Sequence, residues 1–445
     1  MKRVLSTFLA VVVLVGCMLA SPQAHASPQS GGSRAIAIVF DNSGSMYTGG
    51  NQAWCRATYA MEVFAAMLNP GDTLDIYPMH PIEVEGKEYT MNSPFRITDA
   101  SQSSKIRDIY TPNALGTPIE SIDCAMEGIR KATADKKYLI VLSDGNAFSW
   151  YNSEMSILET KRQLDARFQE AGRDLTMMYL GIGNNVVMPD TPQSVYFSKK
   201  QAKNSSDVLS SLTEMCNLIF GRDTLPKSRY SGNQINFDIT MSKIIVFVQG
   251  QNVADLKVTG PSGPVGTQIY AAATKYGSAA SGSYTSYPDT TLQGMMVTYT
   301  NCAAGTYTIE YSGTATSVEV YYEPDADLDF VFTDSEGNTV NPLALYEGDY
   351  KVSFGMKDAK TGKLINSDLL GNPEYRGSYF INGERKPIES EGFSGSADIP
   401  LKMGDKFEAE LTVTYLSGYT ISKDARDFGW PEGGIIAPET AGQRT

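Results

Sequence analysis

The chain has 445 residues, of which 42% are hydrophobic and 20% charged, and its formal net charge is −13 at pH 7. That length exceeds one hydrophobic core, and the composition is that of a globular rather than a disordered protein, so we expect several domains. The acidic balance argues against nucleic acid and anionic membranes as partners, because both repel a negatively charged surface.

The first 26 residues have the three parts of a secretory signal peptide. Lys2 and Arg3 precede an apolar stretch to about residue 20, and small residues end the segment at Ala26. Cleavage after Ala26 removes two basic charges and no acidic one, so the mature chain would carry −15. The alternative is a lipoprotein, because Leu14-Val15-Gly16-Cys17 resembles a bacterial lipobox and would leave a lipid anchor at Cys17.

The sequence predicts export without a membrane-spanning segment in the mature chain. After the signal peptide there is no apolar run of eighteen or more residues, so we expect no direct insertion into a membrane. The protein is therefore predicted to be secreted or held at the cell surface. Residues 27–34 read as a linker.

Residues 35–222 alternate between strand and helix patterns. Apolar runs predict strands at 35–40, 73–77, 138–142 and 175–180. Helical periodicity predicts helices at 54–68, 102–109, about 119–134, 153–171 and 206–220. Strands separated by helices imply right-handed crossovers and a mainly parallel, doubly wound α/β sheet.

The pattern becomes all-β after residue 222. Short alternating strands recur, with turn signals such as Gly260-Pro261-Ser262-Gly263 between them, as in antiparallel sandwiches. Two hundred residues exceed one such sandwich, so we divide the region near Pro324. This predicts two β-sandwich domains at 223–323 and 324–428, which generically resemble immunoglobulin-type sandwiches, followed by a flexible tail at 429–445.

The first chemical motif is Asp41-Asn42-Ser43-Gly44-Ser45-Met46, which directly follows the apolar run 35–40. Open α/β sheets hold ligands at the carboxyl ends of their strands, where this turn would lie. Carboxylate and hydroxyl oxygens without thiol or imidazole select hard cations such as Mg2+, Ca2+ or Mn2+. The motif alone is expected by chance in roughly one chain in ten of this length. The stronger evidence for a site is that the motif directly follows a predicted buried strand.

Two later segments complete a family pattern. Thr117 lies in Gly116-Thr117-Pro118, and Asp144 lies in Leu142-Ser143-Asp144-Gly145 after a predicted strand. Together with the first motif they resemble the metal-ion-dependent adhesion site of von Willebrand factor type A domains, over roughly residues 35–222. The resemblance implies hydroxyl ligands from Ser43, Ser45 and Thr117.

The same resemblance implies that Asp41 and Asp144 bind the cation directly or through water, and that a carboxylate from a protein partner completes the octahedron. Three neutral hydroxyls would leave the cation much of its positive charge, so an acidic partner would be attracted even to an acidic protein. The alternative is that these Ser and Asp residues only cap neighbouring helices.

Aromatic residues flank the predicted metal loops. We expect Tyr47, Trp150 and Tyr151 at the rim as contacts for the partner, whereas Trp54 and Phe148 are weaker candidates. The alternative is that about half of these side chains belong to the core.

Four cysteines remain in the mature chain, and an exported compartment permits disulfides. We favour Cys55 with Cys124, because both fall early in predicted helices that begin just after the metal loops. Free, buried thiols are the alternative, since cysteine is among the most buried residue types.

These features predict an extracellular, divalent-cation-dependent binding or adhesion module rather than an enzyme. No Gly-x-Ser-x-Gly, phosphate-binding or His-Glu-x-x-His motif is present, and His80 is the only mature histidine. Two alternatives stay open. One is an envelope component whose metal only stabilises the fold, and the other is a carbohydrate-active enzyme with paired carboxylates in the β region.

Overall fold

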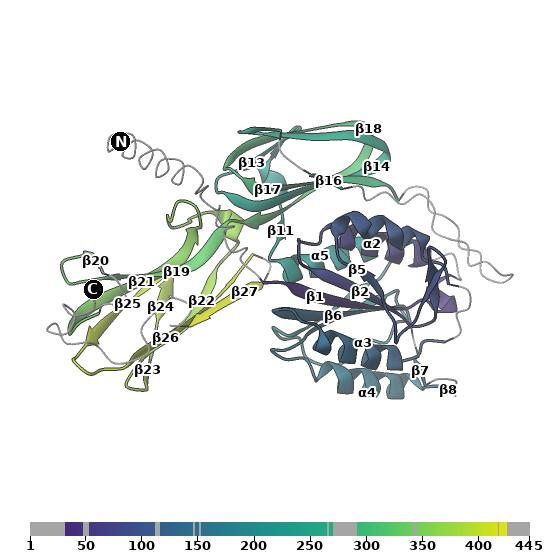
Figure 1. The fold of residues 1–445 in the computed structure, drawn as a ribbon, viewed down its shortest axis with the longest axis horizontal. Helices are drawn as coiled ribbons and strands as arrows, with labels where there is room; N and C mark the ends of the chain where they lie inside the picture. The colour runs from purple at the N-terminus through teal and green to yellow at the C-terminus, as the bar shows by residue number, and fades with distance from the viewer. Residues whose placement is uncertain are drawn as a thin grey trace, which may run out of the picture. The chain divides into compact units, whose positions relative to one another are not determined.

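The structure is a computed structural model that describes residues 32–47, 53–111, 116–145, 147–150, 153–264, 267–269, 292–340, 345–416 and 418–424 (Figure 1). The predicted signal peptide with Cys17, the rim residue Tyr151 and the tail 429–445 lie outside the described residues. Within the described part, no helix combines the length and the apolar character needed to cross a bilayer. Residues from Gly32 onward form one compact unit, so the divisions at 222 and 323 stay predictions.

A six-stranded sheet forms the centre of the N-terminal part. Its strands are β1 (Arg34–Phe40), β2 (Thr73–Pro78), β5 (Phe95–Ile97), β6 (Lys136–Ser143), β9 (Thr176–Ile182) and β10 (Phe197–Ala202), in the order β10-β9-β6-β1-β2-β5. Every neighbouring pair is parallel except β2 with β5. All seven residues of β1 are buried, as expected for a central parallel strand covered on both faces.

Helices cover both faces of this sheet, which confirms the predicted doubly wound α/β arrangement. On one face lie α2 (Ala53–Ala66) and α5 (Val208–Phe220), and on the other α3 (Glu120–Lys131) and α4 (Ile157–Phe168) (Figure 1). Alternate side chains of β1 enter the two cores, with Ile38 on the α2 side and Val39 on the α3 side.

Two predicted helices differ from the structure. Residues Ala100–Asp108 form a 3-10 helix, and α4 begins only at Ile157 because a hairpin of β7 (Ser149–Trp150) and β8 (Ser153–Glu154) precedes it. The sequence also hid the edge strand β10, whose residues Phe197–Ala202 carry polar side chains between two apolar ends. A second short hairpin, β3 (Ile82–Val84) with β4 (Lys87–Tyr89), follows β2.

The first β region is one sheet rather than the predicted two-sheet sandwich. Its path runs β12-β13-β18-β14-β17-β16, with β11 and β15 attached. The bounds are β11 (Asp223–Thr224), β12 (Tyr230–Ser231), β13 (Gln234–Phe237), β14 (Met241–Gly260), β15 (Gly263–Pro264), β16 (Thr267–Ile269), β17 (Gly294–Cys302) and β18 (Gly305–Pro324).

The difference arises from two strands of 20 residues each, β14 and β18. Their pairing shifts register at several points between Gln249 and Lys257, as β-bulges do, and both halves of β14 contribute to one core, through Val246 and Val258. Gly313 has a φ of +90°, and a Cβ there would lie 2.2 Å from the Asn252 carbonyl oxygen, so this crossing requires glycine. Strand patterns do not reveal that one sheet bends onto itself.

The second β region is a two-sheet sandwich, as predicted. One sheet has the order β20-β19-β21-β25-β24 and the other β23-β22-β26-β27. The bounds are β19 (Ala326–Thr333), β20 (Thr339–Val340), β21 (Gly348–Asp358), β22 (Glu374–Ile381), β23 (Glu384–Pro387), β24 (Glu389–Glu391), β25 (Ser394–Leu401), β26 (Phe407–Tyr415) and β27 (Tyr419–Asp424). Both sheets bury side chains in one core, for example Phe332 of β19 and Val413 of β26.

Candidate metal centre

The carboxyl ends of two neighbouring strands bring the predicted carboxylates to one edge of the N-terminal sheet. Asp41 directly follows β1, and Asp144 directly follows β6, which pairs with β1 in parallel. The Asp41 amide donates to the Leu142 carbonyl at 2.9 Å, so the pairing continues into the first loop. After Ser43 the chain curls into a 3-10 turn, Gly44–Met46, which turns the motif back on itself.

Hydrogen bonds join four of the five predicted ligand residues. The Ser43 and Ser45 hydroxyl oxygens lie 3.0 Å apart, and the Ser45 hydroxyl donates to Asp144 Oδ1 at 2.8 Å. The Ser43 amide donates to Asp41 Oδ1 at 3.0 Å. The first and third loops therefore present their oxygens at a common point, while their role in metal binding stays a prediction.

Thr117, the fifth predicted residue, lies beside the Asp144 loop. A Cβ added to Gly145 would lie 3.5 Å from Thr117 Cγ2. The Thr117 carbonyl accepts from the Ser149 amide at 2.9 Å, which ties its loop to the base of the β7–β8 hairpin. The preceding residue, Gly116, has a φ of +77°, a conformation that favours glycine. Thr117 itself is buried, so its side chain faces protein rather than solvent.

The surroundings of the two carboxylates disfavour their charged forms. Burial raises the pKa of Asp41 above its ordinary value, although hydrogen bonds from Ser143 and Ser43 and the nearby imidazole of His80 oppose the shift. Burial, and then the negative charge of Asp41, raises the pKa of Asp144 to about 7. Among the described residues, neither carboxylate forms a salt bridge with a Lys or Arg.

A hard divalent cation fits this donor set. The two carboxylates, one buried and one half-buried, have no described Lys or Arg partner to balance their negative charge, and every predicted ligand atom is an oxygen. In the described part of the chain, no group of three or more His, Cys, Asp or Glu side chains could hold a metal ion. The candidate set therefore depends on its three hydroxyls, Ser43, Ser45 and Thr117, as much as on its carboxylates.

Three supporting residues escaped the sequence reasoning. Ser143 is fully buried, and its hydroxyl donates to Asp41 Oδ2 at 2.5 Å while accepting from the Gly145 amide at 3.0 Å. Asn42 and His80 are joined by hydrogen bonds, and the His80 ring also contacts the carbonyl of Gly116 in the Thr117 loop. Ser143 and Asn42 stand inside the quoted motifs, whereas no sequence signal placed His80 at this edge.

The predicted aromatic rim is only partly described. Tyr47 is half-buried and stacks on Trp54 with ring centroids 4.5 Å apart. Trp54 and Phe148 are buried in the core, as the alternative reading held. The side chain of Trp150, like the whole of Tyr151, lies outside the described part of the structure. The rim function of Tyr47, Trp150 and Tyr151 thus stays a prediction.

The predicted disulfide between Cys55 and Cys124 is wrong in this structure, because neither cysteine takes part in a disulfide. Cys55 lies in α2 and Cys124 in α3, and these helices cover opposite faces of the sheet. Loops at one edge can lead into helices on either face, so neighbouring helix starts do not bring the two thiols together. Cys216 and Cys302 take part in no disulfide either, and both are buried.

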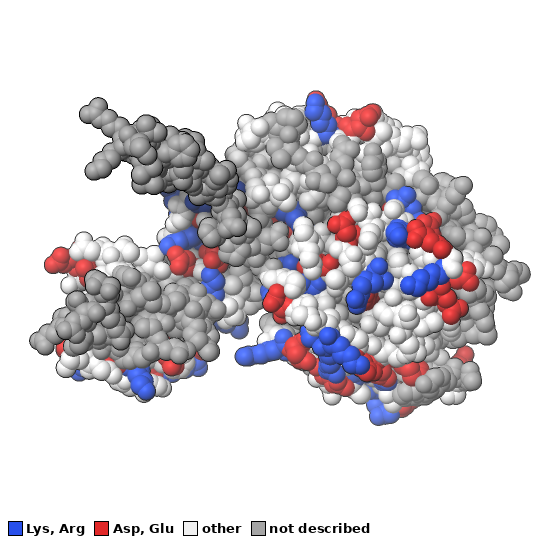
Figure 2. Space-filling view, in the orientation of Figure 1, with Lys and Arg blue, Asp and Glu red and all other residues white. Residues whose placement is uncertain are grey.

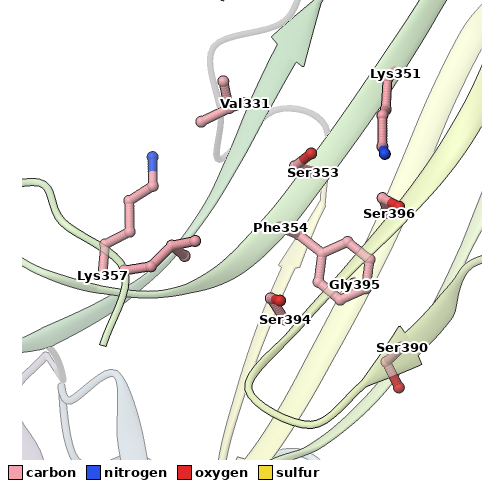
Figure 3. Close-up of a pocket in the computed structure, with 10 residues that line it drawn as sticks. Val331, Lys351, Ser353, Phe354, Lys357, Ser390, Ser394, Gly395 and Ser396 are labelled. Carbon is pink, nitrogen blue, oxygen red and sulfur yellow. The ribbon is translucent and has the colours of Figure 1, made fainter. Parts of the chain in front are cut away.

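Two further surface features lie away from the metal loops. A hollow of about 690 Å³ on the C-terminal sandwich is lined mainly by Ser353, Ser394, Ser396, Lys351 and Lys357, and it contains none of the predicted metal residues (Figure 3). On the face seen in Figure 2, the basic side chains that are drawn lie interspersed with acidic ones.

Comparison with known proteins does not assign a family. No family model matches the chain, and no curated protein matches its sequence. Similar solved structures include proximal thread matrix protein 1 from the mussel byssus, with 13% identity, a TM-score of 0.31, and coverage of 43% of this chain and 47% of that one. The von Willebrand factor domain of the type V pili tip protein Mfa5 from Porphyromonas gingivalis has 11% identity, a TM-score of 0.32, and coverage of 43% and 95%.

The pilus adhesin SpaC from Lactobacillus rhamnosus GG is similar over more of this chain, with 11% identity, a TM-score of 0.31, and coverage of 88% and 66%. The chain thus spans about half of the mussel protein and 66% of SpaC. These neighbours are extracellular matrix and pilus proteins, but at such TM-scores and identities the likeness carries no argument about function. The functional case rests on the geometry of the three loops.

Proposed function

We propose that this chain is an exported, von Willebrand factor A-like binding protein whose three loops hold a divalent cation, most simply Mg2+, for an acidic group on a protein partner. Asp41, Ser43, Ser45, Thr117 and Asp144 would hold the cation. The observation that carries the proposal is the carboxylate pair of buried Asp41 and half-buried Asp144, which is joined through the Ser43 and Ser45 hydroxyls and has no Lys or Arg partner among the described residues.

The residues around the site support binding rather than only charge neutralisation. Ser45 is exposed, whereas Asp41 and Ser43 are buried, so the site is open on the Ser45 side. A bound cation supplies a positive centre that a partner carboxylate can reach from solvent. The chain's own residues hold the oxygens in place through the Ser143–Asp41 and Ser45–Asp144 hydrogen bonds.

An exposed apolar segment that follows the hairpin tied to the Thr117 loop suits a protein partner. Ile157 and Leu158 begin α4, directly after the hairpin that is tied to the Thr117 loop, and their side chains are 61% and 79% exposed. Exposed aliphatic side chains can bury apolar surface of a protein partner. The proposed function is binding and not catalysis.

The test is cation binding followed by partner binding. Isothermal titration of Mg2+ and Mn2+ into the full chain should show one site in the wild type and none in Asp144→Ala. Asp190→Ala is a matched control, because Asp190 is exposed and paired with Lys161 rather than with a metal loop. The proposal fails if Asp144→Ala binds the cation as the wild type does.

Affinity capture of surface proteins then separates binding from a purely structural metal. The proposal expects partners that are retained with Mg2+, released by a chelator, and absent from Asp144→Ala. If the chelator lowers the melting temperature but every partner stays bound, the cation only stabilises the fold and the binding role is refuted.

A further inference from the structure

His80 connects two of the three metal loops. It lies two residues beyond the end of β2, the strand next to β1. Its backbone makes a two-point contact with the fully buried amide of Asn42, in the first loop. The His80 amide donates to Asn42 Oδ1 at 2.8 Å, and Asn42 Nδ2 donates to the His80 carbonyl at 2.9 Å.

The imidazole ring of the same residue contacts the second loop. His80 Nε2 lies 2.8 Å from the Gly116 carbonyl oxygen, and a carbonyl can only accept, so Nε2 carries the proton. Gly116 directly precedes Thr117. On the far side of that residue, the Thr117 carbonyl accepts from the Ser149 amide. The segment that carries the Thr117 hydroxyl is thus held from both sides, by His80 and by the hairpin.

Asn42 reinforces this connection. Its Nδ2 also donates to the Thr111 hydroxyl at 3.2 Å, so the amide is satisfied on both of its ends. A buried amide with all its partners in place has one orientation, which fixes the turn between Asp41 and Ser43 relative to β2. The hydrogen bonds to Asn42 fix the position of the His80 backbone, and the hydrogen bond from the His80 ring in turn fixes the position of Gly116.

We infer that His80 is a positioning residue of the metal centre, which sets the spacing between the Asp41–Ser45 turn and the Thr117 loop. The inference rests on the proposed cation-binding function. Metal sites need their ligands held within roughly 0.5 Å of the productive geometry. Residues that orient ligands typically change metal affinity by about 10-fold to 100-fold when removed. The backbone contact with Asn42 remains in any variant of His80, so a substitution tests the ring alone.

Two substitutions separate the ring's hydrogen bond from its bulk. In His80→Gln the amide nitrogen is as many bonds from Cβ as Nε2 is, so it can still donate to Gly116. His80→Leu keeps an apolar side chain and removes the donor. Mg2+ affinity of the full chain, measured by isothermal titration, should fall about 10-fold to 100-fold in His80→Leu. It should stay within about threefold of the wild type in His80→Gln.

A double-mutant cycle tests the route through the second loop. Thr117→Val removes the hydroxyl and keeps the shape. If His80 acts by placing that hydroxyl, His80→Leu should weaken binding by less than about twofold in the Thr117→Val background. A general loss of stability would instead weaken binding equally in both backgrounds.

The outcomes distinguish this inference from the function on which it rests. If the wild type binds no Mg2+ or Mn2+, the proposed function fails and the positioning role fails with it. If the wild type binds and His80→Leu binds equally well, only the inference is overturned. Equal losses in His80→Gln and His80→Leu, or additive losses in the cycle, overturn it too.

Discussion

Replacing Asp144 by Asn should stabilise the protein in the absence of cations. Burial and the charge of Asp41 raise the pKa of Asp144 from 3.8 to about 7 in the folded protein. The folded state therefore keeps a proton that the unfolded state loses, and stability falls as pH rises from about 4 to 7. Asn is neutral throughout, and its oxygen can still accept from Ser45.

The size of the effect follows from the shift. Each pKa unit corresponds to about 1.4 kcal/mol, so a shift of this size corresponds to about 4 kcal/mol above pH 7. We expect the free energy of unfolding of the cation-free Asp144→Asn variant to exceed that of the wild type by up to that amount at pH 8. Near pH 4 the two values should be equal. Mg2+ at 100 times its dissociation constant should raise the free energy of unfolding of the wild type by about 2.7 kcal/mol and leave that of the variant unchanged.

The assay is thermal unfolding of the full chain at pH 4, 6 and 8, in chelator and in Mg2+. Asp190→Asn is the control, because Asp190 is 73% exposed. A cation-free Asp144→Asn variant that unfolds at or below the wild-type temperature at pH 8 would refute the claim that the surroundings of Asp144 disfavour its charged form. If Mg2+ raises the unfolding temperature equally in the variant and the wild type, the role of the carboxylates in binding Mg2+ is refuted.

Three further outcomes are expected. Ser143→Ala leaves the buried Asp41 carboxylate without its hydroxyl donor, so Mg2+ affinity by titration should fall about 10-fold to 100-fold, whereas unchanged affinity would remove Ser143 from the site. Arg222→Met removes a fully buried guanidinium paired with Glu323, and denaturant unfolding should show a loss of about 3 kcal/mol, which a neutral result would contradict. Alkylation followed by mass spectrometry should label the half-buried thiol of Cys124 well before the three buried thiols, with no disulfide-linked peptides.

The α/β part of the fold follows from periodicity because its central strands are buried on both faces. The apolar runs that contain Val39 and Val141 could only be inner strands of a covered sheet, and the structure places them side by side. Edge elements carry a weaker signal. β10 has two adjacent lysines, Lys199 and Lys200, in its middle, so its sequence resembles a loop.

The β regions show a different limit of the sequence. Alternation marks where strands lie but not which strands share a sheet, because pairing is decided by contacts between distant residues. The two long strands β14 and β18 fold one sheet onto itself around register shifts near Gly250, and no local pattern distinguishes this from two sheets. The second region also alternated, and there the same pattern did correspond to two sheets.

At the candidate site, the sequence could name residues that stand in a motif but not those that hold the motif in place. Asp41 and Asp144 follow strands that pair, so topology alone puts them at one edge. The same topological reasoning led to the wrong disulfide prediction. It shows that the loops meet at one edge of the sheet, but it does not show which face of the sheet the helix after each loop covers.

His80 illustrates why such supporting residues are hidden. A lone histidine after a strand has no partner in the sequence, and its link to the site passes through two backbone carbonyls and one amide side chain. Backbone partners leave no residue-type signature, because every residue has a carbonyl. The loops that carry hydroxyl ligands depend most on such contacts, since a neutral hydroxyl is attracted to a cation less strongly than a carboxylate is. The hydroxyl of Thr117 should therefore be more sensitive to distant substitutions than either carboxylate.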